Sequence, residues 1–395
     1  MRLSVNPESA VPLHVQLLDQ IRHLILSGEW LPGSRLPSEA ELRDRLQISR
    51  GTIRQSLQNA EVEGLIERVP GKGSFVAQAA GREVPLRLIG FVTSDFLSDH
   101  QRQLLRGAEQ LAQSRGYSIL FSSSSQDLAT EDRLLDRMVS DQVSGVLIWP
   151  IYEDAPKRRL FELGLRCHTP IVLMDRMIPG LTCDSVASDN YAGAYAATQH
   201  LLRLGHRRVV FLTRPLLELS TIADRLRGYR DALQDAGLAP LEPWFIEPGL
   251  GEKGERFALH QYSSAGTNVE VAAIARRLAG PRPPTAIFAM TDLTALLALK
   301  AASLAGLNVP RDLSLVGFDD MDFVTLLPVP LTSVAQDTFA LGRRAAELLI
   351  ERIEGYDGPP RRELLPTRLM VRATTARPSC EGPPPADPPG EGNDT

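Results

Sequence analysis

The N-terminal fold follows from one segment, Leu46-Gln47-Ile48-Ser49-Arg50-Gly51-Thr52-Ile53-Arg54-Gln55-Ser56-Leu57. Ser49 is a good N-cap, because its hydroxyl accepts a hydrogen bond from an amide that the first helical turn leaves without a partner. Arg50 and Arg54 are four residues apart, so they share one solvent-facing side of the helix. Apolar residues recur at helical spacing on the other side, at Ile53, Leu57 and Ala60. The segment predicts an amphipathic helix with a capped, basic N-terminus.

A second short helix is predicted directly upstream, beginning within Pro37-Ser38-Glu39-Ala40-Glu41. Ser38 and Glu41 have the spacing of a capping box, and Leu42 and Leu46 give this helix a buried stripe. Two short helices joined by a tight turn, the second one basic at its start, form the geometry that enters the major groove of DNA. The alternative is an ordinary surface helix with two solvated arginines, since short helix pairs are common.

The flanking residues predict the rest of a small domain. An amphipathic helix that ends at Gly28 is indicated upstream by apolar residues at helical spacing: Leu13, Leu17, Ile21, Leu24 and Ile25. Downstream, residues 65–69 and 74–76 have the pattern of two strands around Pro70-Gly71-Lys72-Gly73. Such a hairpin tip, with flexible glycines and one cation, can lie along a phosphate backbone or a minor groove. Taken alone, the tip is equally an ordinary turn.

Together these motifs resemble the winged helix-turn-helix of the GntR family of bacterial regulators over residues 12–77. The matching segments are Leu36-Pro37-Ser38-Glu39, Ser49-Arg50-x-Thr52-Ile53-Arg54, Glu63-Gly64-Leu65-Ile66 and Gly71-x-Gly73-Ser74-Phe75-Val76. The resemblance implies that Arg50, Thr52 and Arg54 contact DNA and that the glycines of the wing approach its backbone. The full set expected at the DNA is Arg35, Ser38, Glu39, Ser49, Arg50, Thr52, Arg54, Gly71, Lys72 and Gly73.

From residue 86 onward, apolar strands alternate with helical patterns. The first series of strands is expected at 87–92, 117–121, 146–149 and 171–174, and the second at 209–212, 286–289 and 313–316. Continuous apolar strands between helices are typical of parallel sheets that are covered on both faces. The predicted fold class is therefore α/β, with an N-terminal winged helix-turn-helix followed by two similar subdomains with parallel sheets.

Informative residues, polar ones and one aromatic, follow several of these strands, at the edge where ligands bind in such folds. They are Ser94, Asp95 and Phe96 after the first strand, Asp175 after the fourth, and Asp292, Asp319 and Asp320 in the second series. A single aspartate at a strand end is as well explained by helix capping. Together with Arg225, the group suggests recognition of hydroxyl groups through charge-assisted hydrogen bonds.

Residues 86–375 also resemble the effector domain of LacI-type repressors and the related type I periplasmic binding proteins. The segments that carry this likeness are Ser188-Asp189-Asn190, Leu204-Gly205-His206-Arg207-Arg208-Val209, Arg225-x-x-Gly228, 312–320 and Leu331-Thr332-Ser333-Val334-x-Gln336-Asp337. The resemblance implies that an effector cleft between the subdomains is lined by Ser94, Asp175, Arg225, Thr291, Asp319 and Gln336. The strand ends add Asp95, Phe96 and Asp292 to the expected effector site.

The predicted domains are a DNA-binding domain at 1–77, a linker at 78–85, an effector domain at 86–376 and a disordered tail at 377–395 that is rich in Pro, Gly and acids. Within the effector domain, 86–189 with 336–355 should form one subdomain, and 190–335 with 356–376 the other. A GntR-type reader joined to a LacI-like sensor is similar to the arabinose repressor group. The likeness implies a repressor that binds a palindromic operator as a homodimer and senses a small sugar-like effector, with release or promotion of DNA binding both open.

Composition agrees with a cytoplasmic protein. Of 395 residues, 43% are hydrophobic and 23% are charged, and no apolar run is long enough for a membrane span. The N-terminus lacks the apolar core of a secretion signal. The three cysteines, Cys167, Cys183 and Cys380, are odd in number and lack metal-ligand spacing, which predicts reduced thiols and no metal site.

The sequence leaves two other functions to consider, that of an enzyme and that of a solute-binding protein for transport. The chain has no G-x-G-x-x-G after the first strand, no P-loop and no nucleophile elbow, and its seven histidines are scattered. A transport protein needs no DNA reader. The sequence therefore favours a regulator without enzymatic activity and without a cofactor.

Overall fold

The computed structural model describes residues 3–5, 12–26, 28–69, 72–77, 87–94, 99–151, 160, 162, 169–246 and 264–379. The chain divides into two compact units, Met1–Leu86 and Arg87–Thr395. The predicted linker, 78–85, and residues 380–395 of the predicted tail lie outside the described residues.

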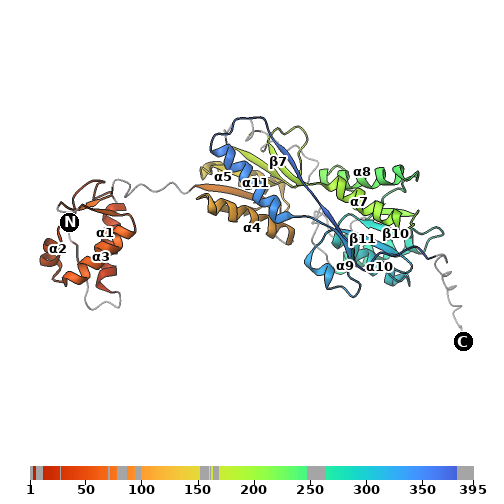
Figure 1. Ribbon diagram of the computed structural model, residues 1–395, viewed down its shortest axis with the longest axis horizontal. Helices are drawn as coiled ribbons and strands as arrows, with labels where there is room; N and C mark the ends of the chain where they lie inside the picture. The colour runs from red at the N-terminus through yellow and green to blue at the C-terminus, as the bar shows by residue number, and fades with distance from the viewer. Residues whose placement is uncertain are drawn as a thin grey trace. The chain divides into compact units, whose positions relative to one another are not determined.

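The first unit is a three-helix domain with a small antiparallel hairpin (Figure 1). Its elements are α1 (Leu13–Leu26), α2 (Glu39–Leu46), α3 (Arg50–Val62), β1 (Ile66–Val69) and β2 (Gly73–Val76). Ser38 and Glu41 form the predicted capping box, and the Ser49 hydroxyl accepts a hydrogen bond of 3.1 Å from the Thr52 amide. Ile53 and Leu57 are buried in the core of this unit, as their spacing predicts.

The second unit contains two six-stranded sheets, and the first of them is entirely parallel. Its order is β13 (Arg362–Leu365), β7 (Asp184–Ser188), β6 (Ile171–Met174), β5 (Gly145–Trp149), β3 (Leu88–Thr93) and β4 (Ser118–Ser123). Helices α4 (Asp99–Ser114) and α11 (Thr338–Ile353) cover one face, and α5 (Leu128–Ser140) packs on the other. The α4–α11 contact requires Gly342, since a Cβ there would lie 1.9 Å from the Leu104 carbonyl oxygen.

The second sheet is parallel except at one edge, where β14 runs antiparallel to β12. Its order is β14 (Arg368–Met370), β12 (Thr332–Ala335), β11 (Ser314–Asp319), β10 (Ala286–Ala289), β8 (Val209–Thr213) and β9 (Trp244–Phe245). The covering helices are α7 (Asn190–Arg203) and α8 (Ser220–Asp235) on one face and α9 (Ser264–Leu278) and α10 (Asp292–Leu304) on the other, with a 3₁₀ turn η1 (Asp322–Thr325) after β11. The predicted fold class is confirmed.

One predicted subdomain boundary is wrong. Residues 356–376 were expected in the second subdomain, but β13 pairs in parallel with β7 of the first sheet. Glu363 of β13 accepts two hydrogen bonds of 2.7 Å from Arg344 on α11, and Leu365 packs against the first core. The chain therefore enters the second subdomain for the last time at β14 rather than at residue 356.

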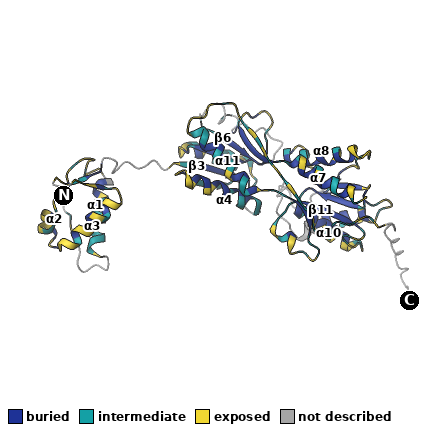
Figure 2. Cartoon of the chain, in the orientation of Figure 1, coloured by how far each residue is buried: buried dark blue, intermediate teal, exposed yellow. Residues whose placement is uncertain are grey.

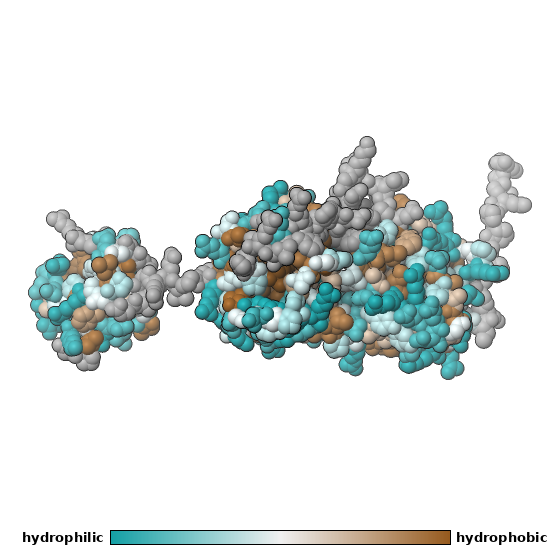
Figure 3. All heavy atoms as spheres, turned by 90° about the horizontal axis from the view of Figure 1, so that it is seen from above, coloured by the Kyte–Doolittle hydropathy of each residue, from teal (hydrophilic) through white to brown (hydrophobic). Residues whose placement is uncertain are grey.

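The inner strands of both sheets are largely buried, whereas the edge strands β4, β9, β13 and β14 are partly exposed; exposed residues also lie on the outer faces of the helices (Figure 2). On the face shown in Figure 3, hydrophilic residues predominate and apolar residues are interspersed among them, as on most protein surfaces. Within the described residues, each helix is too short or too polar to cross a membrane.

Candidate effector cavity and DNA-reading helix

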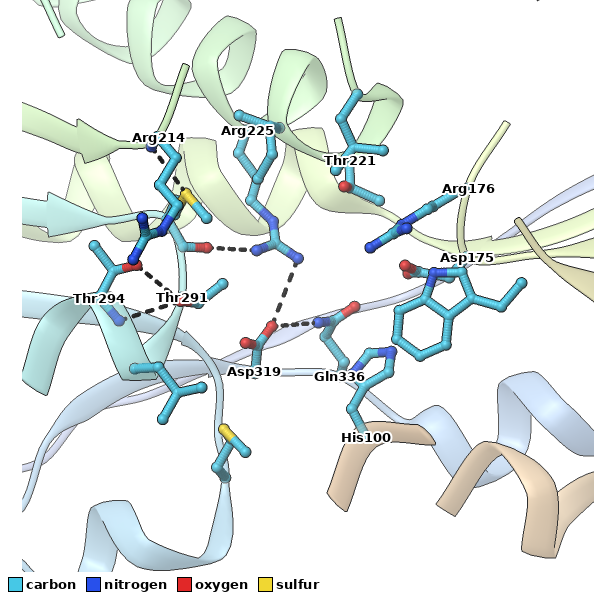
Figure 4. Close-up of a pocket in the computed structure, with 16 residues that line it drawn as sticks. His100, Asp175, Arg176, Arg214, Thr221, Arg225, Thr291, Thr294, Asp319 and Gln336 are labelled. Carbon is cyan, nitrogen blue, oxygen red and sulfur yellow. Dashed lines mark hydrogen bonds and ion pairs between the residues drawn. The ribbon is translucent and has the colours of Figure 1, made fainter. Parts of the chain in front are cut away.

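A cavity of about 90 Å³ lies between the two sheets of the second unit (Figure 4). That volume is several times what one water molecule needs. Its lining residues are His100, Trp149, Asp175, Arg176, Arg214, Leu219, Thr221, Ile222, Arg225, Met290, Thr291, Leu293, Thr294, Asp319, Met321 and Gln336. Many of them end or directly follow a strand, including β5, β6, β8, β10, β11 and β12. This is the edge at which parallel α/β sheets bind ligands.

Arg225 occupies the middle of the cavity and is only 4% exposed. Its Nε donates a 2.8 Å hydrogen bond to Asn190 Oδ1, and its Nη1 donates to the Met290 carbonyl oxygen. Its Nη2 lies 3.6 Å from Asp319 Oδ1, and its guanidinium carbon lies 3.6 Å from the centre of the Phe318 ring. The guanidinium group is thus held by Asn190 at the start of α7 and by the carboxyl ends of β10 and β11.

Asp319 faces Arg225 from the end of β11, with a left-handed φ of 113°. Such a backbone conformation is costly for a residue with a side chain and is often found at ligand sites. Gln336 Nε2 donates a 2.7 Å hydrogen bond to Asp319 Oδ1. Burial raises the pKa of Asp319 to about 7, opposed by the charge of Arg225 and assisted by that of Asp175.

Three buried polar atoms of the lining have no hydrogen-bond partner among the described residues: Trp149 Nε1, Asp175 Oδ1 and Gln336 Oε1. Buried polar groups in native proteins are almost always paired, so each such atom needs an explanation. One of the three is a donor and two are acceptors, and hydroxyl groups can serve both kinds. The cavity is therefore built to bind a polar molecule rather than an apolar one.

Five of the nine predicted effector residues line the cavity together: Asp175, Arg225, Thr291, Asp319 and Gln336. Asp95 and Phe96 lie outside the described residues. Ser94 is fully buried and is not among the described residues that line the cavity, so its place in the site stays a prediction.

Asp292 is also not among the described residues that line the cavity. Its carboxylate is fully buried, and it accepts hydrogen bonds of 2.5 Å from the Ser333 hydroxyl and 2.8 Å from the Met321 amide. Burial raises the pKa of Asp292 well above its usual range. The side chain therefore holds the loop after β11 in place and does not line the cavity.

Several lining residues were not predicted, notably His100, Trp149, Arg176 and Arg214. The His100 and Trp149 rings lie 5.1 Å apart, and the guanidinium carbon of Arg176 lies 5.1 Å from the centre of the Trp149 ring. Trp149 ends β5, Arg176 comes just after β6 and Arg214 directly follows β8. Their positions at strand ends are the signal that indicates them, because ligands bind at the carboxyl ends of parallel strands whether the residues there are acidic, basic or aromatic.

In the first unit, α3 buries Ile53, Ser56, Leu57 and Ala60 and turns its basic side to solvent. Arg50 and Arg54 are exposed in its first two turns, and Thr52 is half-buried between them. Arg54 Nε donates a 3.1 Å hydrogen bond to Glu39 Oε2 of α2, so this arginine is held in place across the turn.

The remaining residues expected at the DNA have mixed surroundings. Ser38 and Ser49 are exposed, but their hydroxyls already cap α2 and α3. Arg35, Lys72 and Gly73 are exposed on or beside the wing, with φ of 115° at Gly73. Gly71 lies outside the described residues.

Comparison with known proteins finds a matching protein family for each of the two units. Residues 13–76 match the bacterial regulatory proteins of the gntR family, and residues 198–375 match the periplasmic binding protein-like domain. The chain is 32% identical over 355 residues to the arabinose metabolism transcriptional repressor of Geobacillus stearothermophilus, covering 88% of this chain and 93% of that one.

Two solved structures agree with this assignment. The complex of the transcriptional regulator CelR with cellobiose has a TM-score of 0.62 at 26% identity, over 84% of this chain and 93% of that one. A LacI family transcriptional regulator from Mycobacterium smegmatis has a TM-score of 0.61 at 27% identity, over 74% and 100%. The chain therefore belongs to the family of transcriptional repressors, regulators rather than enzymes, in which a GntR-type DNA-binding domain is joined to a periplasmic binding protein-like domain.

Proposed function

We propose that this repressor binds a palindromic operator in the cytoplasm as a homodimer, and that a small polyhydroxylated effector in the cavity controls that binding. The main support is the lining, in which Trp149, Asp175 and Gln336 each carry a buried polar atom without a partner among the described residues. The names of two relatives, one concerned with arabinose metabolism and one solved with cellobiose, support a sugar or a sugar derivative.

Control by the effector needs a difference in affinity. The cavity takes residues from both subdomains, so their closure changes its shape. An effector shifts the balance between two arrangements only when it binds one of them more tightly, and moving a ratio from 1:99 to 99:1 takes about 5.5 kcal/mol. Groups that contact the effector from both sides, such as Asp175 and Arg225, supply that preference.

The direct test of the proposal uses the DNA upstream of the gene. Fluorescence anisotropy of that DNA, labelled, should show binding by the full chain that exceeds binding to random DNA by at least about 1,000-fold. A panel of sugars and sugar derivatives should contain a compound that changes this affinity. Equal binding to both DNAs would contradict the proposal.

Arg54→Ala should weaken operator binding by about 1–3 kcal/mol, which is roughly 5- to 150-fold, because one arginine contact to a guanine edge is lost. Arg54 is exposed and its ion pair with Glu39 lies at the surface, so the fold should be retained. Anisotropy titrations at one fixed salt concentration measure the change. Arg22→Ala is the matched control, since Arg22 is another surface arginine of this unit that pairs with Glu63. Equal losses in both variants would contradict the assignment of α3.

The dimer is proposed to form through the second subdomain. Apolar side chains are unusually exposed there, with Leu296 at 39%, Leu304 at 66% and Leu326 at 83%. Leu296 also lines a largely apolar groove between α10 and the segment after η1, together with Leu293, Leu297, Leu299, Leu307, Leu327, Pro328 and Val329. Exposed apolar surface of this kind is typical of protein–protein contacts. A two-fold operator needs two readers, which favours a second copy of this chain as the partner.

Leu326→Arg should make the protein monomeric at micromolar concentration, because it would bring a charge into an apolar contact without a partner. Light scattering on the full chain measures the mass. Leu241→Arg is the control, since Leu241 is 41% exposed in the segment after α8, whereas Leu326 follows η1 directly before Leu327 of the groove. A Leu326→Arg protein that stays dimeric would exclude this surface.

A further inference from the structure

The charges that face the cavity are unequal. Among the described residues, three arginines line it, Arg176, Arg214 and Arg225, and two carboxylates, Asp175 and Asp319. The acid that pairs with Arg214 is Glu270 of α9, which is 6% exposed, is not part of the lining and lies 2.9 Å from Arg214 Nη1.

The polar groups are also unequally distributed along the cavity (Figure 4). At one end, near His100, lie the three atoms without partners, on Trp149, Asp175 and Gln336. The other end, as Figure 4 draws it, carries Arg214, Thr291 and Thr294, and Thr291 caps α10. The first end, where Arg176 also lies, offers hydrogen bonds for hydroxyl groups, and the other offers Arg214 and the N-terminus of a helix.

Arg214 has donors left for a ligand. Its side chain makes one ion pair among the described residues, through Nη1 to Glu270, so Nε and Nη2 remain. The Thr291 and Thr294 hydroxyls bond each other at 3.0 Å, and one hydroxyl hydrogen of that pair remains as well. A guanidinium edge matches a carboxylate, which accepts two hydrogen bonds in one plane.

We propose that the effector is a sugar acid, with its carboxylate bound by Arg214 and its hydroxyl groups bound by Asp175, Gln336 and Trp149. The inference rests on the proposed function and names the ligand class of the same cavity. A neutral sugar would leave the remaining donors of Arg214 in a largely buried site without a charged acceptor, which costs affinity. A site built to bond a polar group discriminates strongly against an analogue that lacks it. Glu270 is a positioning residue, which holds Arg214 against the wall of the cavity.

Calorimetry on the full chain with matched pairs of compounds tests the inference. The pairs are D-galactose with D-galacturonate, D-glucose with D-glucuronate and L-arabinose with L-arabinonate, and D-glucose 6-phosphate is added as a phosphate ester. In at least one pair the acid should bind at least about 10-fold more tightly than its neutral partner, which corresponds to about 1.4 kcal/mol.

The double variant Arg214→Met with Glu270→Met should abolish this preference. Both charges are removed together, because removal of one alone would leave a buried charge unpaired. Affinity for the neutral sugar should change by less than about threefold, since the hydroxyl-binding end is untouched. Arg227→Met is the control, since Arg227 is an exposed arginine of α8 with a surface ion pair to Asp224.

The outcomes separate the inference from the proposed function. Neutral sugars that bind as tightly as their acids, or tighter, in every pair that binds overturn the sugar-acid inference and leave the proposed function standing. A preference for the phosphate ester overturns the carboxylate assignment. A preference for the acid that survives in the double variant excludes Arg214 as its cause. No binding by any compound counts against the inference and the proposed function alike.

Discussion

Arg225→Met is expected to lower effector affinity by about 100-fold or more and to remove the response of operator binding to the effector. Truncating one partner of a buried, hydrogen-bonded charge pair typically costs 2–5 kcal/mol, much of it from the charge left behind. Here the group left behind is Asp319, which lies 3.6 Å from Arg225 in the same cavity. Methionine keeps apolar contact with the Phe318 ring, so the loss falls on charge and hydrogen bonding rather than on packing.

Calorimetry with the effector found by screening measures the affinity, and anisotropy measures the DNA response. Asp319→Asn should cause a loss of its own, because the Gln336 bond to Asp319 Oδ1 remains possible while the charge disappears. Arg227→Met on the same helix is the control, since its side chain is 61% exposed. If Arg225→Met and Asp319→Asn both bind the effector as tightly as the parent and still respond on DNA, the effector does not occupy this cavity.

Position at the carboxyl end of a strand predicted part of this site. It could not distinguish an aspartate that lines the cavity from one that is hydrogen-bonded within the protein. Asp292 and Asp319 both lie at the carboxyl ends of strands in the second subdomain. The Asp292 carboxylate is hydrogen-bonded within the protein, because the hydroxyl of Ser333, 41 positions away, donates to it at 2.5 Å. Asp319 reaches the cavity from a left-handed backbone conformation that no local pattern indicates. The role of each carboxylate is thus decided by contacts between distant residues.

The elements of the fold also differ in whether local sequence or contacts between distant residues determine them. The start of α3 could be predicted because its cap, Ser49, and the amide it bonds are three residues apart. The strand β13 could not, since Arg-Glu-Leu-Leu has no strong strand pattern and its half-buried face is fixed by Arg344 of α11. Local signals therefore predicted the DNA-binding unit and the buried strands, whereas the edge of the first sheet depends on tertiary ion pairs.

The second large effect is expected at Asp184, which joins three elements of the first subdomain. Its buried carboxylate accepts two hydrogen bonds of 2.9 Å from Arg352 on α11. It also accepts bonds of 3.0 Å from Arg361 Nη2 and 2.7 Å from the Arg361 amide, just before β13. Asp184→Ala should lower the free energy of unfolding by about 3–5 kcal/mol at pH 7, because two guanidinium groups lose their shared partner. Urea unfolding of the full chain measures it.

The effect of Asp184 should also depend on pH in a defined direction. Burial acts to raise the pKa of Asp184, but the hydrogen bonds and charges of Arg352 and Arg361 outweigh it, so the pKa lies below its ordinary value. A carboxylate with a lowered pKa contributes stability above its unfolded pKa of about 4 and loses it as pH falls through the folded value. The difference between parent and Asp184→Ala should therefore be full at pH 7 and shrink below about pH 4. Asp141→Ala, which breaks an exposed pair with Arg137, should cost less than about 1 kcal/mol. A difference that stays constant down to pH 2, or equal losses in the two variants, would show that the charge of Asp184 does not hold β7, α11 and β13 together.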